Sequence, residues 1–207
     1  MIKRFTICCP ASLALILCFS TVSLYSQPNS YDDVTPLACN QSQFAKLKRD
    51  AARGHKKEQK ELGDAYASGR CVPTDNTKAT YWYRRSAKKG NADAQFALAM
   101  FLLEGKEIAQ NTVEAASWFR RAAEKDHSGA QYALGSLCIQ GRGLAKDIEQ
   151  GYKWIRVSSP SLDRHTKDVL AEIAKNMNQV ELERAEKAAS LWRAAHDPQT
   201  RKDEARR

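Results

Sequence analysis

The chain has 207 residues, of which 43% are hydrophobic and 28% are charged, and its formal net charge is +9. This length is enough to bury one good core, and the absence of strand-like runs favours an all-helical protein of one domain. The sequence contains no paired acidic motif, nucleophile elbow or phosphate loop. It therefore gives no support to the enzyme classes that these motifs define.

The N-terminus has the layout of a secretory signal. Lys3 and Arg4 precede an apolar stretch, and small and polar residues follow it. We predict a signal peptide over residues 1–26, cleaved before Gln27, and therefore a periplasmic or secreted protein. The stretch 5–25 is also just long enough to remain as a membrane anchor, and this alternative stays open.

A linker and a helical cap are expected after the signal. Residues 27–40 are predicted to be an extended linker. The segment 41–58 aligns, 36 residues back, with the second half of a later repeat. It is therefore predicted to form an N-terminal capping helix.

The middle of the chain repeats itself. Residues 82–105 read WYRRSAKKGNADAQFALAMFLLEG, and a near-copy at residues 118–141 starts 36 residues later. A fixed period of this size marks a solenoid of stacked units, none of which can bury its apolar face alone. The register runs without insertion from about residue 59 to 158. It relates Leu62, Leu98 and Leu134, and likewise Trp82, Trp118 and Trp154.

Each unit is predicted to contain two helices. In the first unit they cover residues 59–68 and 77–89, where apolar residues recur at helical spacing. The equivalent first helices are expected over residues 94–104 and 130–140. A glycine should end each first helix, and an aspartate or asparagine should cap each second helix. These residues are Gly69, Gly105 and Gly141, and Asp75, Asn111 and Asp147.

The repeated pattern is A-x-x-x-L-G-x-x-Y, a glycine, a loop ending in Asp, and A-x-x-W-[YF]-x-x-A-A-x-x-G. It resembles the Sel1-like repeat, a relative of the tetratricopeptide repeat, over about residues 44–160. The resemblance implies a right-handed α-solenoid of antiparallel helix pairs, with repeats at about 59–94, 95–130 and 131–160. Asp126 stands where the family has glycine.

The C-terminal part continues the helical pattern without the repeat signature. Residues 161–197 are predicted to form capping helices, because terminal units of solenoids cover an exposed apolar end. Residues 198–207 are expected to be a charged, frayed tail.

Two cysteines are predicted to form a disulfide. Residues 41–53 and 57–68 should form an antiparallel helix pair, and Cys39 and Cys71 lie at equal distances on either side of its turn. Both would then meet at one end of the pair, where a bridge would oppose fraying. Cys138 falls on a core position of the repeat and is expected to be a small buried hydrophobe.

The candidate partner-binding residues lie on the first helix of each pair. Resemblance to the tetratricopeptide arrangement places these helices on the concave side, and the candidates flank the Leu-Gly core pair. In the alternative, the same side chains pack between neighbouring repeats. The candidates are Lys60, Asp64, Phe96, Met100, Leu103, Tyr132, Ser136 and Ile139.

Charge and histidine placement limit the class of partner. The four histidines are scattered, so no metal site is expected, and no cofactor is predicted. Loss of Lys3 and Arg4 would leave a dispersed net charge of 9 − 2 = +7. In an exported chain this charge favours an acidic or glycan-linked surface over nucleic acid.

The resemblance implies a non-enzymatic adaptor that binds a peptide or protein in the bacterial envelope. We expect the chain to be a monomer. One alternative is a β-lactam- or peptidoglycan-related enzyme. The cysteine-rich branch of the family is associated with such activity, but it places a cysteine pair in every repeat, which this chain does not. The other alternative is a membrane-anchored structural spacer.

Overall fold

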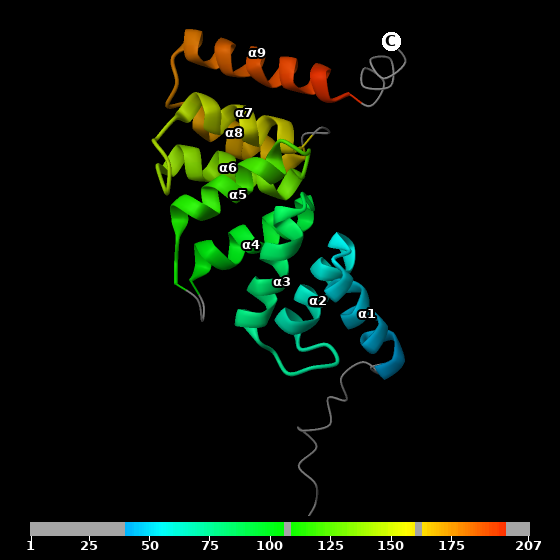
Figure 1. Ribbon diagram of the computed structural model, residues 1–207. Coiled ribbons are helices and arrows are strands. Elements are labelled where there is room, and N and C mark those ends of the chain that lie inside the picture. Colours follow the sequence, from blue (N-terminus) through cyan, green and yellow to red (C-terminus); the bar gives the residue numbers. More distant parts are fainter. Residues whose placement is uncertain (1–39, 106–108, 160–162, 198–207) are drawn as a thin grey trace, which may run out of the picture. The chain divides into compact units, whose positions relative to one another are not determined.

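The computed structural model describes residues 40–105, 109–159 and 163–197. The predicted signal peptide, nearly all of the predicted linker and the charged tail lie outside these residues. Within them there are nine α-helices (Figure 1). None of the helices in the described part of the chain is long and apolar enough to cross a membrane.

The helices pack mainly on their neighbours in the chain, as expected for stacked helix pairs. Each of α1 to α7 contacts the next helix, α8 packs on α7, and α9 also packs on α7. The predicted all-helical fold is therefore confirmed. The helices are α1 (Gln41–Arg53), α2 (Lys56–Ser68), α3 (Asn76–Lys88), α4 (Ala92–Glu104), α5 (Thr112–Ala123), α6 (Ser128–Gln140), α7 (Ile148–Ser158), α8 (Arg164–Ala174) and α9 (Gln179–His196).

The predicted helix ends are confirmed at the glycines and at the second-helix caps. Gly69, Gly105 and Gly141 have φ values of 74°, 69° and 67°, the left-handed conformation that glycine adopts at little cost. The side chains of Asp75, Asn111 and Asp147 accept hydrogen bonds from backbone N–H groups of α3, α5 and α7. These residues therefore fix where each turn begins and ends.

Other boundaries differ from the prediction. The first helix does not extend to residue 58, the end of the expected capping segment; it ends at Arg53, the bound expected for the helix pair, because Gly54 takes a φ of 100° and reverses the chain. Helices α4 and α6 start about one half-turn earlier than expected. Asn91 and His127 cap them by accepting from the N–H groups of Ala94 and Ala130, at 2.8 and 3.1 Å.

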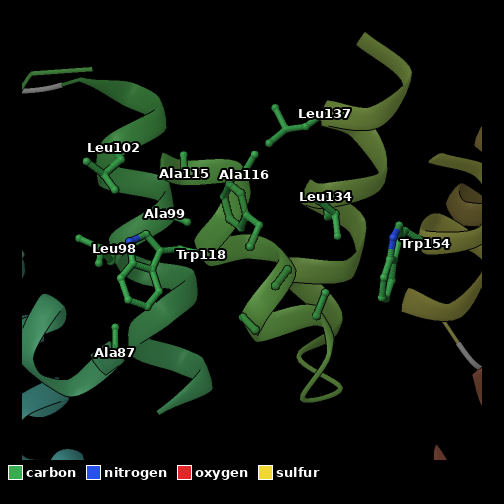
Figure 2. Close-up of a cluster of buried hydrophobic side chains, with 14 of the residues drawn as sticks. Ala87, Leu98, Ala99, Leu102, Ala115, Ala116, Trp118, Leu134, Leu137 and Trp154 are labelled. Atoms are coloured by element: carbon green, nitrogen blue, oxygen red, sulfur yellow. The ribbon is translucent and has the colours of Figure 1, made fainter. Parts of the chain in front are cut away.

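The core repeats with the sequence. Leu62, Leu98 and Leu134 are at most 1% exposed. Figure 2 shows how α4 and α5 contribute facing apolar side chains to one cluster, among them Leu98, Ala99 and Trp118. The burial of this face on neighbouring helices supplies the main driving force for stacking the pairs.

A buried glutamine accompanies each of these leucines. The side-chain N–H₂ groups of Gln59, Gln95 and Gln131 each donate to the backbone carbonyl eight residues earlier, at 3.0, 3.0 and 3.2 Å. All three glutamines are at most 4% exposed. The amides thereby give a second hydrogen bond to carbonyls at the C-terminal ends of α1, α3 and α5, which also accept from the backbone N–H groups of Gly54, Gly90 and Asp126.

The cysteines have different environments. Of the two in the described part of the chain, Cys138 is free and buried, as expected, whereas Cys71 is not free. Burial raises the pKa of the Cys138 thiol. Cys39 lies outside the described residues, so its pairing with Cys71 stays a prediction.

Candidate functional site

The eight candidate residues lie on the first helices α2, α4 and α6, and all are half-buried. On α2, Lys60 and Asp64 form an ion pair at 2.8 Å. The Tyr83 hydroxyl also donates to the Asp64 carboxylate, at 2.9 Å. Burial, together with the Asp64 charge, raises the pKa of Tyr83. The carboxylate of Asp64 therefore already has two partners within the protein.

On α4, the candidate residues pack against the main core. The ring of Phe96 stacks on the imidazole of His127, with centroids 4.6 Å apart, and lies 5.7 Å from the ring of Phe119. Met100 and Leu103 contact the same apolar cluster. Part of each side chain thus packs between helices, and the rest is accessible to solvent.

On α6, the candidates face a different cluster. Tyr132 and Ile139 pack against the apolar cluster that includes Leu170 and Ile173 of α8. The Ser136 hydroxyl donates to the carbonyl of Tyr132, one turn earlier, at 3.1 Å. The five apolar candidates are therefore half-buried and divide between two clusters. Tyr132 and Ile139 join the second cluster because Leu170 and Ile173 of α8 belong to it.

Two cavities lie between α6 and α8. One, of about 350 Å³, is lined by Ser128 and Tyr132 from α6 and by His165 and Thr166 from α8. The Tyr132 hydroxyl lies 3.3 Å from Nε2 of His165. A tyrosine ring beside hydroxyl and imidazole groups offers both an apolar wall and hydrogen-bonding partners to a bound side chain.

The second of these cavities is more apolar at its walls. It has a volume of about 360 Å³ and is lined by Ile139, Ile148 and Ile173, with Lys146 and Glu172 beside them. Ile139 and Tyr132 lie two turns apart on α6. The two cavities therefore follow one helix face that contains two of the predicted residues.

A third cavity, of about 310 Å³, lies where α9 approaches α6 and α7. Its walls include Trp192, Arg193 and His196 of α9 with Gln131 and Val157. The rings of Trp192 and His196 stack with centroids 3.7 Å apart. Burial lowers the pKa of Arg193, and the Arg156 charge adds to this effect.

The sequence did not identify His165, Thr166 or the α9 residues as candidates. These residues lie outside the 36-residue pattern, so no repeat signal aligns them with the first-helix face. The amphipathic pattern of residues 161–197 predicted that this segment packs on the last repeat, but it gave no register for the packing.

The second helices carry a separate set of polar contacts. The Arg84 side chain of α3 forms an ion pair with Glu114 of α5, and the Trp118 indole N–H donates to the same carboxylate at 3.1 Å. Burial raises the pKa of Glu114, but the hydrogen bonds from Arg84 and Trp118 outweigh it and lower the pKa overall. This carboxylate therefore connects two successive units.

No group of three or more His, Cys, Asp or Glu side chains in the described ranges is arranged to hold a metal ion. His127 caps α6, His165 contacts Tyr132, and His196 contacts Trp192. These three histidines thus take part in local packing and capping.

The repeat family follows from comparison with known proteins. The model of the Sel1 repeat matches residues 59–91, 92–127 and 128–157, so each match covers one of the helix pairs α2–α3, α4–α5 and α6–α7. The chain is a Sel1 repeat protein. The matched boundaries lie about three residues before those expected from the sequence, because α4 and α6 begin at Ala92 and Ser128.

Solved structures of bacterial Sel1-like proteins are similar to this chain. A Sel1 repeat protein from Oxalobacter formigenes is 28% identical with a TM-score of 0.57, and the match covers 63% of this chain and 98% of that one. The protective antigen c5321 of uropathogenic Escherichia coli is 29% identical with a TM-score of 0.68. That match covers 78% of this Sel1 repeat protein but only 35% of c5321.

A third structure is more distant. Cysteine-rich protein B of Helicobacter pylori is 16% identical with a TM-score of 0.46, and the match covers 60% of this chain and 94% of that one. A search of curated proteins found no significant match.

Proposed function

We propose that this Sel1 repeat protein is a non-enzymatic adaptor that binds a peptide or protein partner on the side of its first helices α4 and α6. The observation that carries this proposal is the position of Tyr132. Its half-buried ring lines a cavity of about 350 Å³ at which α6 meets α8. Partly accessible aromatic rings in such hollows are common anchors of protein interfaces.

The neighbouring side chains suit a peptide partner. Phe96, Met100 and Leu103 keep part of their apolar surface accessible on α4, and Ile139 lines the adjacent cavity of about 360 Å³. Apolar hollows along one helix face fit the alternating side chains of a bound segment. The Ser128 and His165 side chains supply hydrogen-bonding groups beside them.

The proposal places the protein in the bacterial envelope as a periplasmic or secreted monomer. The motivating feature is the order of charged, apolar and small residues over 1–26. The similar E. coli protein is a protective antigen. A Cys39–Cys71 disulfide would suit an oxidising compartment, and the net positive charge favours an acidic or glycan-linked partner surface.

Site-specific photocrosslinking in the native host tests the proposal. A photoreactive residue at Ser136, one turn after Tyr132, is expected to form a covalent adduct with the partner. The control position is Ser117, which is exposed on the second helix α5. Adducts of equal yield from both positions would contradict the proposed face.

A second variant in the same cells shows whether the ring matters. Tyr132→Ala should abolish the Ser136 adduct while costing only about 1–2 kcal/mol of stability, less than a fully buried aromatic would. Tyr81→Ala removes a ring that is 54% exposed on α3 and should leave the adduct unchanged. An adduct that survives Tyr132→Ala in a folded protein would exclude Tyr132 as an anchor.

A further inference from the structure

Three junctions between successive second helices can be compared position by position. At the two outer junctions an arginine on one helix pairs with a glutamate 30 positions later on the next, and the 36-residue register puts Arg120 and Gln150 at the equivalent positions of the middle junction. The pairs are Arg84 and Glu114 at α3–α5, Arg120 and Gln150 at α5–α7, and Arg156 and Glu186 at α7–α9. The middle junction alone has an uncharged residue in place of glutamate.

The two outer junctions are built around a carboxylate with two donors. Glu114 accepts from Arg84 and from the Trp118 indole N–H. Glu186 lies 3.4 Å from Nε of Arg156 and accepts from the Tyr152 hydroxyl at 2.6 Å. In both cases a charged and a neutral donor converge on one side-chain carboxylate, an arrangement that charge-assisted hydrogen bonds stabilise.

The middle junction repeats the donors without the acceptor. Arg120 corresponds to Arg84, and Trp154 to Trp118, each 36 residues later. Among the described residues, neither the Arg120 guanidinium nor the Trp154 indole N–H donates a hydrogen bond. The side chain of Gln150 is exposed and makes none either. A neutral amide also cannot compensate the arginine charge.

Lys153 adds a second positive charge at the α5–α7 junction. The Nζ atom of Lys153 lies 4.2 Å from the centre of the Trp154 ring. Burial lowers the pKa of Lys153; the Arg120 charge lowers it further, whereas Cys138 and the carboxylates of Asp147 and Glu124 oppose this effect. Neither carboxylate forms an ion pair with Arg120 in the described part of the chain.

We propose that the α5–α7 junction is a binding site for a carboxylate, formed by Arg120 and the Trp154 indole N–H and filled by an aspartate or glutamate side chain of a partner protein. A carboxylate is the expected occupant because the chain's own glutamates fill the junctions on both sides. The site lies on the second helices, so it does not depend on the proposed Tyr132 anchor.

The internal glutamates suggest the sharpest test. In Gln150→Glu, the new side chain should occupy the site as Glu114 does in the preceding unit. This variant should therefore raise the denaturation midpoint slightly and shift the Trp154 indole N–H signal in ¹⁵N NMR spectra. It should also weaken binding of a hexaglutamate peptide by about tenfold, the effect of losing one charged hydrogen-bonding site.

Matched variants and a second probe make the result decisive. In the wild type, hexaglutamate should shift the Trp154 indole signal, and Arg120→Gln should abolish this response. Gln140→Glu adds the same charge at an exposed position of α6 and should bind like the wild type. Glu114→Gln should open the equivalent site and make the Trp118 signal respond as well.

Three results would overturn the proposal. The first is an absence of any Trp154 response to hexaglutamate in the wild type. The second is a response that persists in Gln150→Glu. The third is a stronger response to inorganic phosphate than to hexaglutamate at equal ionic strength, which would assign the site to a phosphate group.

Discussion

At the scale of single residues, Asp126 departs from an otherwise regular turn. The equivalent positions in the two preceding turns are Gly54 and Gly90, with φ values of 100° and 82°, and Asp126 takes a φ of 61°. A residue with a Cβ atom is strained in this left-handed region, although aspartate tolerates it better than most. The sequence showed that aspartate replaces glycine here. Only the backbone shows that Asp126 keeps the left-handed conformation of the two equivalent glycines.

The strain at this turn predicts a difference between two substitutions. Asp126→Gly should be more stable than Asp126→Ala by about 1 kcal/mol, because alanine keeps the Cβ penalty and glycine does not. Both variants remove the carboxylate, so its own contacts cancel in the comparison. Chemical denaturation measures the difference, and equal midpoints would show that the turn is not strained.

Glu114 predicts an acid-dependent loss of stability. Its folded-state pKa is lowered by Arg84 and Trp118 against the opposing effect of burial. A depressed pKa contributes stability that is present above the unfolded value of about 4.3 and is lost as pH falls through the folded value. Because Arg84 is 38% exposed, the contribution should be only about 0.5 kcal/mol.

Denaturation at pH 7 and at pH 3 measures this contribution. Glu114→Gln should lose about 0.5 kcal/mol at pH 7 and less at pH 3, because the contribution is lost as pH falls through the depressed folded-state pKa of Glu114. Glu61→Gln removes an exposed carboxylate of α2 that forms no ion pair in the described structure. It serves as the control, and an equal loss in both variants at pH 7 would contradict the inter-unit role of Glu114.

At the scale of helices, α6 and α7 approach each other unusually closely. A Cβ atom on Gly135 would lie 2.8 Å from the carbonyl oxygen of Gly151, well inside normal contact. The equivalent positions in the preceding pair are Ala99 and Ala115, which are fully buried. The last repeat therefore has the smallest residue, glycine, at both of these contact positions.

Gly135→Ala should therefore destabilise the protein even though alanine favours helices. The added methyl group must push α6 away from α7, and overpacking of this kind costs about 1–3 kcal/mol. The neighbouring change Ser136→Ala alters helix propensity without this clash, so it should stay within about 0.5 kcal/mol of the wild type. Thermal melts of the two variants distinguish packing from propensity, and similar melting temperatures would contradict the close approach.

At the scale of the whole chain, the sequence predicted those features that repeat. The 36-residue register located the core leucines, the glycine turns and the second-helix caps, because each depends on residues close together in the chain. The packing of α8 and α9 could not be predicted in the same way. The contact of Tyr132 with His165 depends on side chains beyond the repeat signature, and Tyr132 is half-buried.

The register also determines which polar contacts link the units. Arg84 with Glu114 and Arg156 with Glu186 occur where the sequence supplies both partners, and Gln150 leaves the middle junction open. The residues alone did not identify this difference, since the pairs are 30 positions apart rather than 36. The helix packing was needed to show which positions face each other.

The central claim is that the repeat register gives the α3–α5 and α5–α7 junctions the same geometry. A pair of double-mutant cycles tests it most directly. The account predicts a coupling of about 0.5–1 kcal/mol between Arg84 and Glu114 in denaturation measurements, and none between Arg120 and Gln150. Once Gln150→Glu is introduced, a coupling of similar size should arise between the new carboxylate and Arg120. Coupling that stays absent in the engineered pair, while Arg84 and Glu114 remain coupled, would contradict the common register of the three junctions.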